Sequence, residues 1–271
     1  MRRLLPWFLA TVLVLSTAGC KRSPSGEPNT LRVGASPVPH AIILEHVKPQ
    51  LAQEGIKLQI VELTDYVQPN LALAEGELEA NFFQHQPYLD QFNADRGTRL
   101  VSAGKVHVEP LGVYSRRHAS LEALPEGAVV AIPNDPTNAA RALRLLETAG
   151  LLTLKKVQGL PTALDVAQNP RKLSLRELES AQLPRSLPDV DAAVINTNYV
   201  LEAGLDPVRD ALAREGTDSP YANIVAVRPE LLNDPRVVSL MRALHRPETQ
   251  RFITERFQGA IVPVPSPGEA N

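Results

Sequence analysis

The sequence predicts an α/β protein of two lobes, each a mostly parallel sheet flanked by helices. Two observations support this class. Predicted strands and helices alternate from residue 31 to residue 96, which favours parallel strands joined by helices. Residues 100–114 then stay β-rich through Glu109 and Pro110 with no helical segment, as expected of a chain that crosses from one lobe to another.

The composition agrees with a folded chain of this size. The 271 residues are 44% hydrophobic and 21% charged, which is typical of a globular protein with one large or two ordinary domains. The formal net charge is −2, and no basic patch recommends nucleic acid as a partner.

The first residues have the pattern of a signal peptide. Arg2 and Arg3 form a basic start, residues 4–15 are apolar, and Ala18-Gly19 is a small-residue cleavage site. The apolar run is too short for a typical membrane span. Residues 1–19 are therefore expected to be removed, which takes the net charge from −2 to −4.

Cys20 is the only cysteine, so neither an intramolecular disulfide nor a thiolate metal cluster is possible. Its position after Ala18-Gly19 resembles a lipobox, in which cleavage leaves a lipid-modified N-terminal cysteine. Thr17 departs from the aliphatic residue usual in that pattern, and ordinary cleavage before a chance cysteine is the alternative. Residues 20–30 are then a lipidated cysteine and a flexible, Pro-, Ser- and Gly-containing tether, which places the protein on the cell envelope.

Three strands open the folded part. They are predicted at residues 31–35, 57–63 and 81–85. Between the first two, Ile43, Val47 and Leu51 recur at helical spacing, and Gly55 ends that helix. A helix begins near Pro69, and another begins at Pro87.

The second half has the same alternation. Strands are predicted at 128–132, 190–195 and 224–227, and helices begin at Asp135-Pro136, Asn198, Asp234-Pro235 and Pro247. Gly150 and Gly204 end two of these helices. A further helix is expected over residues 175–181, within a segment of irregular periodicity. We assign residues 31–108 and 229–271 to lobe I and residues 109–228 to lobe II.

The stretch Ala80–Asp90 concentrates aromatic residues in a chain that is only 4% aromatic. Alternation along its strand places Phe83 and His85 on one face and Phe82 and Gln84 on the other. A strand end followed by a helix is where open α/β sheets bind ligands. Alternatively, the two phenylalanines are core residues and His85 caps the helix.

An amino-acid ligand needs a cation for its carboxylate and acceptors for its ammonium. Arg141 lies in the second turn of the helix that begins at Pro136, so its guanidinium can reach a carboxylate near the positive helix end, with bidentate geometry. Asn196 and Asn223 lie at strand ends and can both donate and accept. Tyr66 adds an aromatic wall or a hydroxyl. Each has a structural alternative: a solvated arginine, turn asparagines and a half-buried tyrosine.

Six segments together resemble the methionine-binding lipoproteins, the substrate-binding proteins of methionine ABC importers. They cover most of residues 31–262 and are LRVGASPVPHAIIL, VELTDYVQPNLALAEGELEANFFQH, ANFFQHQPYLDQF, VAIPNDPTNAARALRLLETAGLL, LPDVDAAVINTNYVLEAGL and SPYANIVAV.

The resemblance implies a type II periplasmic-binding-protein fold with the ligand in the cleft between the lobes. It also implies a protein that carries methionine to an importer permease, without a cofactor and as a monomer. It also implies that a common set of residues lines the methionine pocket: Tyr66, Phe82, Phe83, His85, Arg141, Asn196 and Asn223.

Three other functions are weighed against this one. A metal-binding receptor is disfavoured because the six histidines form no HxH pair or HExxH motif. An enzyme is disfavoured because GxSxG, GxGxxG and phosphate-loop motifs are absent. The third possibility keeps the fold and changes the ligand to another apolar amino acid, a dipeptide, or D-methionine alongside L-methionine.

Overall fold

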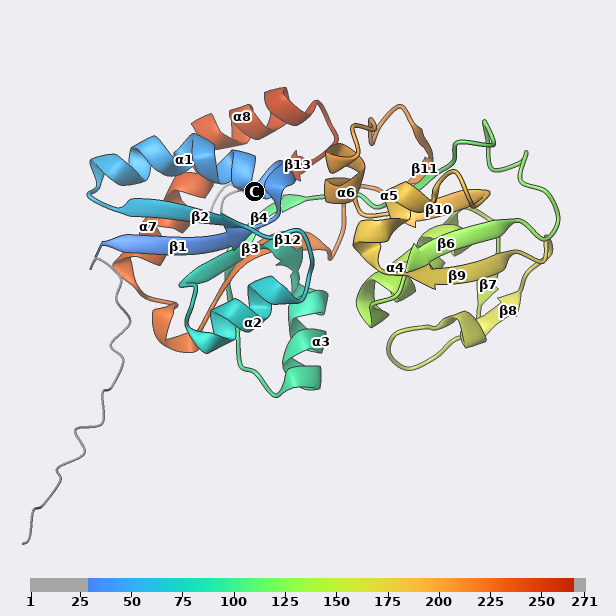
Figure 1. Cartoon of the computed structure of the whole chain (residues 1–271), viewed down its shortest axis with the longest axis horizontal. Coiled ribbons are helices and arrows are strands. Elements are labelled where there is room, and N and C mark those ends of the chain that lie inside the picture. Colours follow the sequence, from blue (N-terminus) through green and yellow to red (C-terminus); the bar gives the residue numbers. More distant parts are fainter. Residues whose placement is uncertain (1–28, 266–271) are drawn as a thin grey trace, which may run out of the picture.

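The computed structural model describes residues 29–265, which form two lobes side by side, each with its own sheet (Figure 1). Cys20, the signal peptide and most of the tether lie outside the described residues. None of the helices between residues 29 and 265 combines the length and the apolar character needed to span a bilayer.

The first lobe is built on a six-stranded sheet. Its strands are β1 (Thr30–Ala35), β2 (Lys57–Glu62), β3 (Ala80–His85), β4 (Val101–Val108), β12 (Ala222–Val227) and β13 (Val262–Pro263), in the spatial order β13-β4-β12-β3-β1-β2. β1 pairs in parallel with β2 and β3, whereas the pairings of β12 and β13 are antiparallel. The strands β1, β2 and β3, which α1 and α2 connect, therefore form the parallel part of the sheet.

Helices cover both faces of this sheet. They are α1 (Ile42–Gln53), α2 (Gln68–Glu75), α3 (Gln86–Arg96), α7 (Pro235–Leu244) and α8 (Pro247–Phe257). In Figure 1, α1, α7 and α8 lie on one side of the sheet and α2 and α3 lie on the other. Side chains of α1, α7 and α8 form one core cluster with β1, and side chains of α2 and α3 form another. The lobe is thus a three-layer α/β/α arrangement.

The second lobe has a five-stranded sheet in the order β11-β5-β10-β6-β9. The strands are β5 (Gly112–Tyr114), β6 (Val129–Pro133), β9 (Ser174–Leu178), β10 (Ala192–Ile195) and β11 (Ala211–Arg214), and a separate hairpin joins β7 (Thr153–Leu154) to β8 (Val166–Gln168). The helices are α4 (Pro136–Thr148), α5 (Leu183–Ser186) and α6 (Thr197–Glu202). The core beneath α4 and the core beneath α5 and α6 occupy opposite faces.

Local signals predicted most of these elements correctly. Asp135 caps α4 by accepting a hydrogen bond from the Asn138 amide, as expected of an acid before a proline at the first helical position. Gly150 follows the same helix with φ +74°, a conformation that favours glycine, so its role in ending the helix is confirmed.

Three details of the prediction are wrong. Residues 175–181 are not a helix: most of them belong to the edge strand β9, which pairs with β6 on one side only. Residues 222–227, assigned to lobe II, are β12 in the sheet of the first lobe. The sheets are mixed rather than mostly parallel, because β12 and β5, the strands that begin after the crossings, pair antiparallel to their neighbours.

Within residues 29–265 the chain crosses between the two sheets twice. The first crossing is 109–111, between β4 and β5, and the second is 215–221, between β11 and β12. Both crossings run beside the ends of β3 and β10, so they lie next to any ligand held between the lobes.

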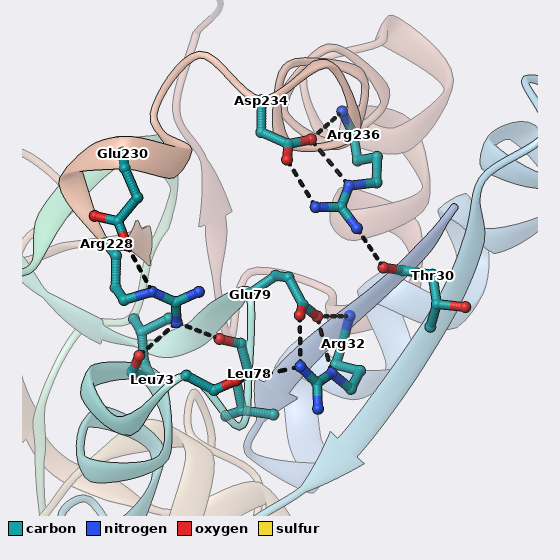
Figure 2. A network of polar contacts seen from close by, with 10 residues as sticks. Thr30, Arg32, Leu73, Leu78, Glu79, Arg228, Glu230, Asp234 and Arg236 are labelled. Atoms are coloured by element: carbon teal, nitrogen blue, oxygen red, sulfur yellow. Dashed lines mark hydrogen bonds and ion pairs between the residues drawn. The ribbon is translucent and has the colours of Figure 1, made fainter. Parts of the chain in front are cut away.

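A network of arginines fastens the first lobe near the start of β1 (Figure 2). The Arg32 guanidinium donates to both oxygens of Glu79, at 3.1 and 2.6 Å. Arg228 Nη1 donates to the carbonyls of Leu73 and Leu78, at 2.6 and 2.7 Å. The Leu73 carbonyl lies in the last turn of α2 and also accepts from the Gly76 amide at 3.3 Å. Arg228 therefore adds to the C-terminal cap of α2 and joins the end of β12 to that helix end.

Replacing Arg228 with alanine is expected to lower the free energy of unfolding by about 1–3 kcal/mol, because two partly buried carbonyls lose a charged donor. Urea unfolding followed by circular dichroism measures the change. Arg242→Ala is the matched control, since its ion pair with Glu54 lies at the surface and contributes little to stability. Equal stability of the Arg228 and Arg242 variants would contradict the role assigned to Arg228.

Candidate ligand-binding site

A pocket of about 340 Å³ lies between the two lobes. It is formed where β3, β10 and β12 meet the first turns of α3, α4 and α6. Its lining comes from both lobes and from the first crossing segment: Tyr66, Phe83, Gln84, His85, Tyr88, Glu109, Asn138, Arg141, Asn196, Thr197, Asn198 and Asn223.

The structure therefore brings together Tyr66, Phe83, His85, Arg141, Asn196 and Asn223, which are far apart in the sequence. Phe82 is the exception. It is fully buried on the opposite face of β3, with its ring 4.6 Å from that of His40 and 5.3 Å from that of His107. Phe82 is thus a core residue, and its assignment to the pocket lining is wrong, because alternation along β3 turns it away from Phe83.

Arg141 is only 2% exposed, and its guanidinium is held on several sides. Glu215 accepts from Nε at 2.9 Å and from Nη2 at 2.6 Å, and the Glu109 carbonyl accepts from Nη2 at 2.7 Å. The ring of Tyr221 lies 4.4 Å from the guanidinium carbon. The bidentate edge expected to receive a ligand carboxylate is thus taken by Glu215, which leaves Nη1 for a ligand.

The asparagines carry complementary open positions. Asn196 donates from Nδ2 to Asn138 at 2.9 Å, while its buried Oδ1 has no partner among the described residues. Asn198 accepts from the Tyr66 hydroxyl at 2.6 Å, while its buried Nδ2 lacks a partner within the same residues. Asn223 accepts from the His40 ring at 3.0 Å. Because buried polar atoms are normally paired, the open acceptor and the open donor indicate a polar ligand.

Aromatic rings form one wall of the pocket. The ring centroids of Tyr66 and Phe83 are 5.8 Å apart, those of Tyr66 and Tyr88 are 5.8 Å apart, and those of Phe83 and Tyr88 are 6.0 Å apart. The Tyr88 hydroxyl donates to the Tyr66 carbonyl at 2.9 Å, which fixes the two rings relative to each other. At these separations the rings contact one another, and the wall that they form suits an apolar, polarisable side chain.

His85 has both a structural and a lining role. Its Nδ1 accepts from the Tyr88 amide at 3.2 Å and so caps α3, which makes Nε2 the protonated nitrogen, 3.3 Å from Asn138 Oδ1. Burial, and next the charge of Arg141, lower the pKa of His85 to about 3. The ring is therefore neutral at physiological pH.

A second buried cluster lies behind the pocket. Nε2 of His107 and Nε2 of His40 lie 2.8 and 3.2 Å from the same carboxylate oxygen of Glu109, and the Asn198 amide donates to the other oxygen at 3.1 Å. Burial lowers the pKa of His40 to about 4 and that of His107 to about 3, and burial raises the pKa of Glu109.

The three ligating atoms of this cluster lie within 4.8 Å of one another, close enough to share a metal ion. Ordinary hydrogen bonding accounts for the same arrangement. A neutral His107 ring with a protonated Nε2 donates to Glu109, and His40 Nε2 donates to Asn223 while lying 3.2 Å from the same carboxylate.

Sequence reasoning missed Glu109, Asn138, Asn198 and Tyr88 as lining residues, and Glu215 as the partner of Arg141. Glu109 carried a usable signal, since it is the one acidic residue in the apolar run VHVEPLGVY. Glu215 carried none, because 74 residues separate it from Arg141.

Comparison with known proteins identifies the family. Residues 31–265 match the family model of the NlpA lipoproteins. The chain belongs to this family. The membrane lipoprotein TpN32 of Treponema pallidum is 44% identical over 251 residues, covering 92% of the chain and 94% of its own length. The D-methionine-binding lipoprotein MetQ of Salmonella typhimurium is 42% identical over 253 residues, covering 92% and 93%.

Solved structures agree with this family membership. A nutrient-binding protein from Burkholderia cenocepacia, crystallised with methionine, is 47% identical with a TM-score of 0.83, over 86% of this chain and 99% of that protein. The two-lobed fold predicted from the sequence is therefore confirmed. The NlpA family resemblance is confirmed as well, and the protein is a lipoprotein of the substrate-binding kind.

Proposed function

We propose that this lipoprotein captures methionine between its lobes outside the cytoplasm and delivers it to an ABC importer. The observation that supports this most directly is the pocket itself, which combines open polar positions with an aromatic wall. Relatives at 42% identity are named for D-methionine binding, and the structure of a protein of the same fold is described as bound to methionine.

The polar end of the pocket suits a zwitterion. Arg141 Nη1 and the open Nδ2 of Asn198 are donors for the ligand carboxylate. The open Oδ1 of Asn196 and the carboxylate of Glu109 are acceptors for the ammonium. The residues on which the proposal rests are thus Arg141, Asn196, Asn198, Glu109 and Asn223.

The aromatic end suits a thioether. Sulfur in contact with aromatic rings contributes roughly 0.3–1.5 kcal/mol per contact. Tyr66, Phe83 and Tyr88 form the wall against which the methionine side chain would pack, and His85 lies beside Asn138 in the same pocket.

Ligand binding is proposed to close the lobes by bending at the two crossings, 109–111 and 215–221. Direct contacts between the lobes near the pocket support this: the Tyr66 hydroxyl donates to Asn198, and the Tyr199 hydroxyl donates to the Thr64 carbonyl at 3.0 Å. A closed form presents a surface to the permease that differs from the open form. We infer that the protein acts as a monomer and releases its ligand chemically unchanged.

Native mass spectrometry of freshly purified protein, followed by calorimetry after unfolding and refolding to remove bound ligand, tests the proposal. We expect a mass increment equal to methionine in the first measurement and heat of binding in the second. L-methionine, D-methionine, leucine and a methionine dipeptide are titrated in parallel. No increment and no heat with either methionine would exclude methionine capture, and a changed ligand mass after incubation would contradict the non-enzymatic role.

We also propose that Cys20 carries the lipid that anchors the protein to the cell envelope. Cys20→Ser is expected to move the protein from the membrane fraction to the soluble fraction, because the anchoring nucleophile is lost and one acyl chain is worth about 0.8 kcal/mol per buried CH₂. Fractionation with immunodetection measures this, and Ser23→Ala in the tether is the control. A Cys20→Ser variant still found wholly in the membrane fraction would contradict anchoring at that residue.

A further inference from the structure

Only part of the Arg141 guanidinium is open to a ligand. Of the five N–H groups, the one on Nε and both on Nη2 are used by the Glu215 carboxylate and the Glu109 carbonyl. No acceptor for Nη1 is found among residues 29–265. The direction in which Nη1 points is therefore set by the groups that hold the opposite edge.

Glu215 is itself held rigidly. Its backbone amide donates to the Leu111 carbonyl at 2.9 Å, and its Oε2 accepts from the Leu111 amide at 2.9 Å. Its side chain is only 16% exposed. Glu215 thus joins the second crossing, where it lies directly after β11, to the first crossing, where Leu111 precedes β5.

Arg141 consequently contacts both crossings at once. The Glu109 carbonyl belongs to 109–111, and Glu215 belongs to 215–221. Tyr221, also in the second crossing, lies against the guanidinium. A buried arginine has many rotamers, and fixing one of them in advance removes the entropic cost of ordering it when the ligand arrives.

We propose that Glu215 is a positioning residue for ligand capture: it holds the Nε–Nη2 edge of Arg141 so that Nη1 alone faces the ligand carboxylate. This inference rests on the proposed methionine function. The ligand carboxylate is received by a single guanidinium nitrogen rather than by the bidentate edge. Glu215 does not touch the ligand, and it acts only through Arg141.

The test compares methionine with methioninol, which keeps the ammonium and the thioether but has no carboxylate. Purified wild-type protein and the Glu215→Gln variant are titrated with both by calorimetry after ligand removal. Glu215→Gln is expected to weaken methionine binding by roughly tenfold or more and methioninol binding by less than about threefold. In an Arg141→Ala background, Glu215→Gln is expected to change methionine binding by less than about twofold.

A merely structural role gives a different result, because loss of the Leu111 contacts would weaken both ligands equally. Equal losses, or unchanged methionine affinity in Glu215→Gln, would overturn the inference. Glu126→Gln, which removes a carboxylate from an exposed ion pair with Lys172, is the control and is expected to leave both affinities unchanged.

A second variant and the wild-type titration distinguish the possible outcomes. If Glu215→Gln does not fold, as judged by circular dichroism, Glu215→Asp keeps the charge, withdraws it by one methylene and undergoes the same two-ligand comparison, with the same preferential loss of methionine expected. Failure of the wild-type protein to bind methionine would contradict the proposed function, whereas wild-type binding with no preferential loss in the variants would contradict only the positioning role.

Discussion

Arg141→Ala is expected to weaken methionine binding by about 2–5 kcal/mol, the usual effect of removing one partner of a buried charged pair. This corresponds to a rise in Kd of roughly thirty-fold to several thousand-fold. The reason is that Arg141 is 2% exposed and that, among residues 29–265, it is the only arginine or lysine that lines the pocket. Calorimetry after removal of bound ligand measures the change.

Arg176→Ala provides the control for this experiment, since Arg176 is an exposed arginine of β9 outside the pocket lining. Its affinity for methionine should equal that of the wild-type protein. Arg141→Lys separates charge from shape: lysine keeps the positive charge but cannot hold Glu215 and offer a second nitrogen in the same plane. An Arg141→Ala variant with unchanged affinity would show that the ligand carboxylate lies elsewhere.

Acidification from pH 7.5 to 5.5 is expected to destabilise the ligand-free protein through three buried histidines. Burial lowers the pKa of His40 to about 4 and the pKa values of His85 and His107 to about 3, from an unfolded value near 6.5. Between these values the unfolded chain binds protons that the folded chain does not. The stability is therefore present above pH 6.5 and is lost as the pH falls toward 4 and then 3.

Each of the three histidines lowers the free energy of unfolding by about 1.4 kcal/mol over this interval, so together they lower it by about 4 kcal/mol. Two carboxyl groups oppose the trend, because burial raises the pKa of Glu109 and raises that of Glu202 to about 7. Their stabilising contributions are present at low pH and lost as the pH rises through the raised values. Glu202 is exposed, and solvent screening reduces its contribution.

Comparing the stability of the wild-type protein with that of His107→Gln isolates the contribution of one histidine. His107→Gln keeps a donor toward Glu109 and removes one titrating ring. The fall in stability between pH 7.5 and 5.5, measured by urea unfolding, should be smaller than in the wild-type protein by about 1.4 kcal/mol. An identical fall in both proteins would mean that the His107 ring takes up its proton equally in the folded and unfolded states.

Helix boundaries could be predicted where the signal is local. Asp135-Pro136 and Gly150 delimit α4 through hydrogen bonds and φ angles that involve only neighbouring residues. β9 could not be predicted in this way, since its residues are largely exposed and its pairing partner β6 lies more than forty residues earlier in the chain. An edge strand with a weak apolar pattern depends on its partner for its conformation.

Phe82 and Phe83 also show the difference between what neighbouring residues predict and what distant residues decide. Alternation predicted that they point to opposite faces of β3, and the structure agrees. Which of the two faces opens to the pocket depends on what packs there. His40 and His107 cover Phe82, whereas Phe83 packs beside Tyr66 and Tyr88 in the pocket wall.

By itself the sequence determined the α/β class, the two lobes, the family and most of the residues that meet in the pocket, because strand alternation, helix caps and extended family segments are properties of contiguous residues. Only the tertiary structure decided that Glu215 holds the bidentate edge of Arg141, that Glu109 lies among two histidines, and that β12 belongs to the first sheet. Those arrangements join residues that are far apart along the chain, and their energies arise only when folding excludes water from between them.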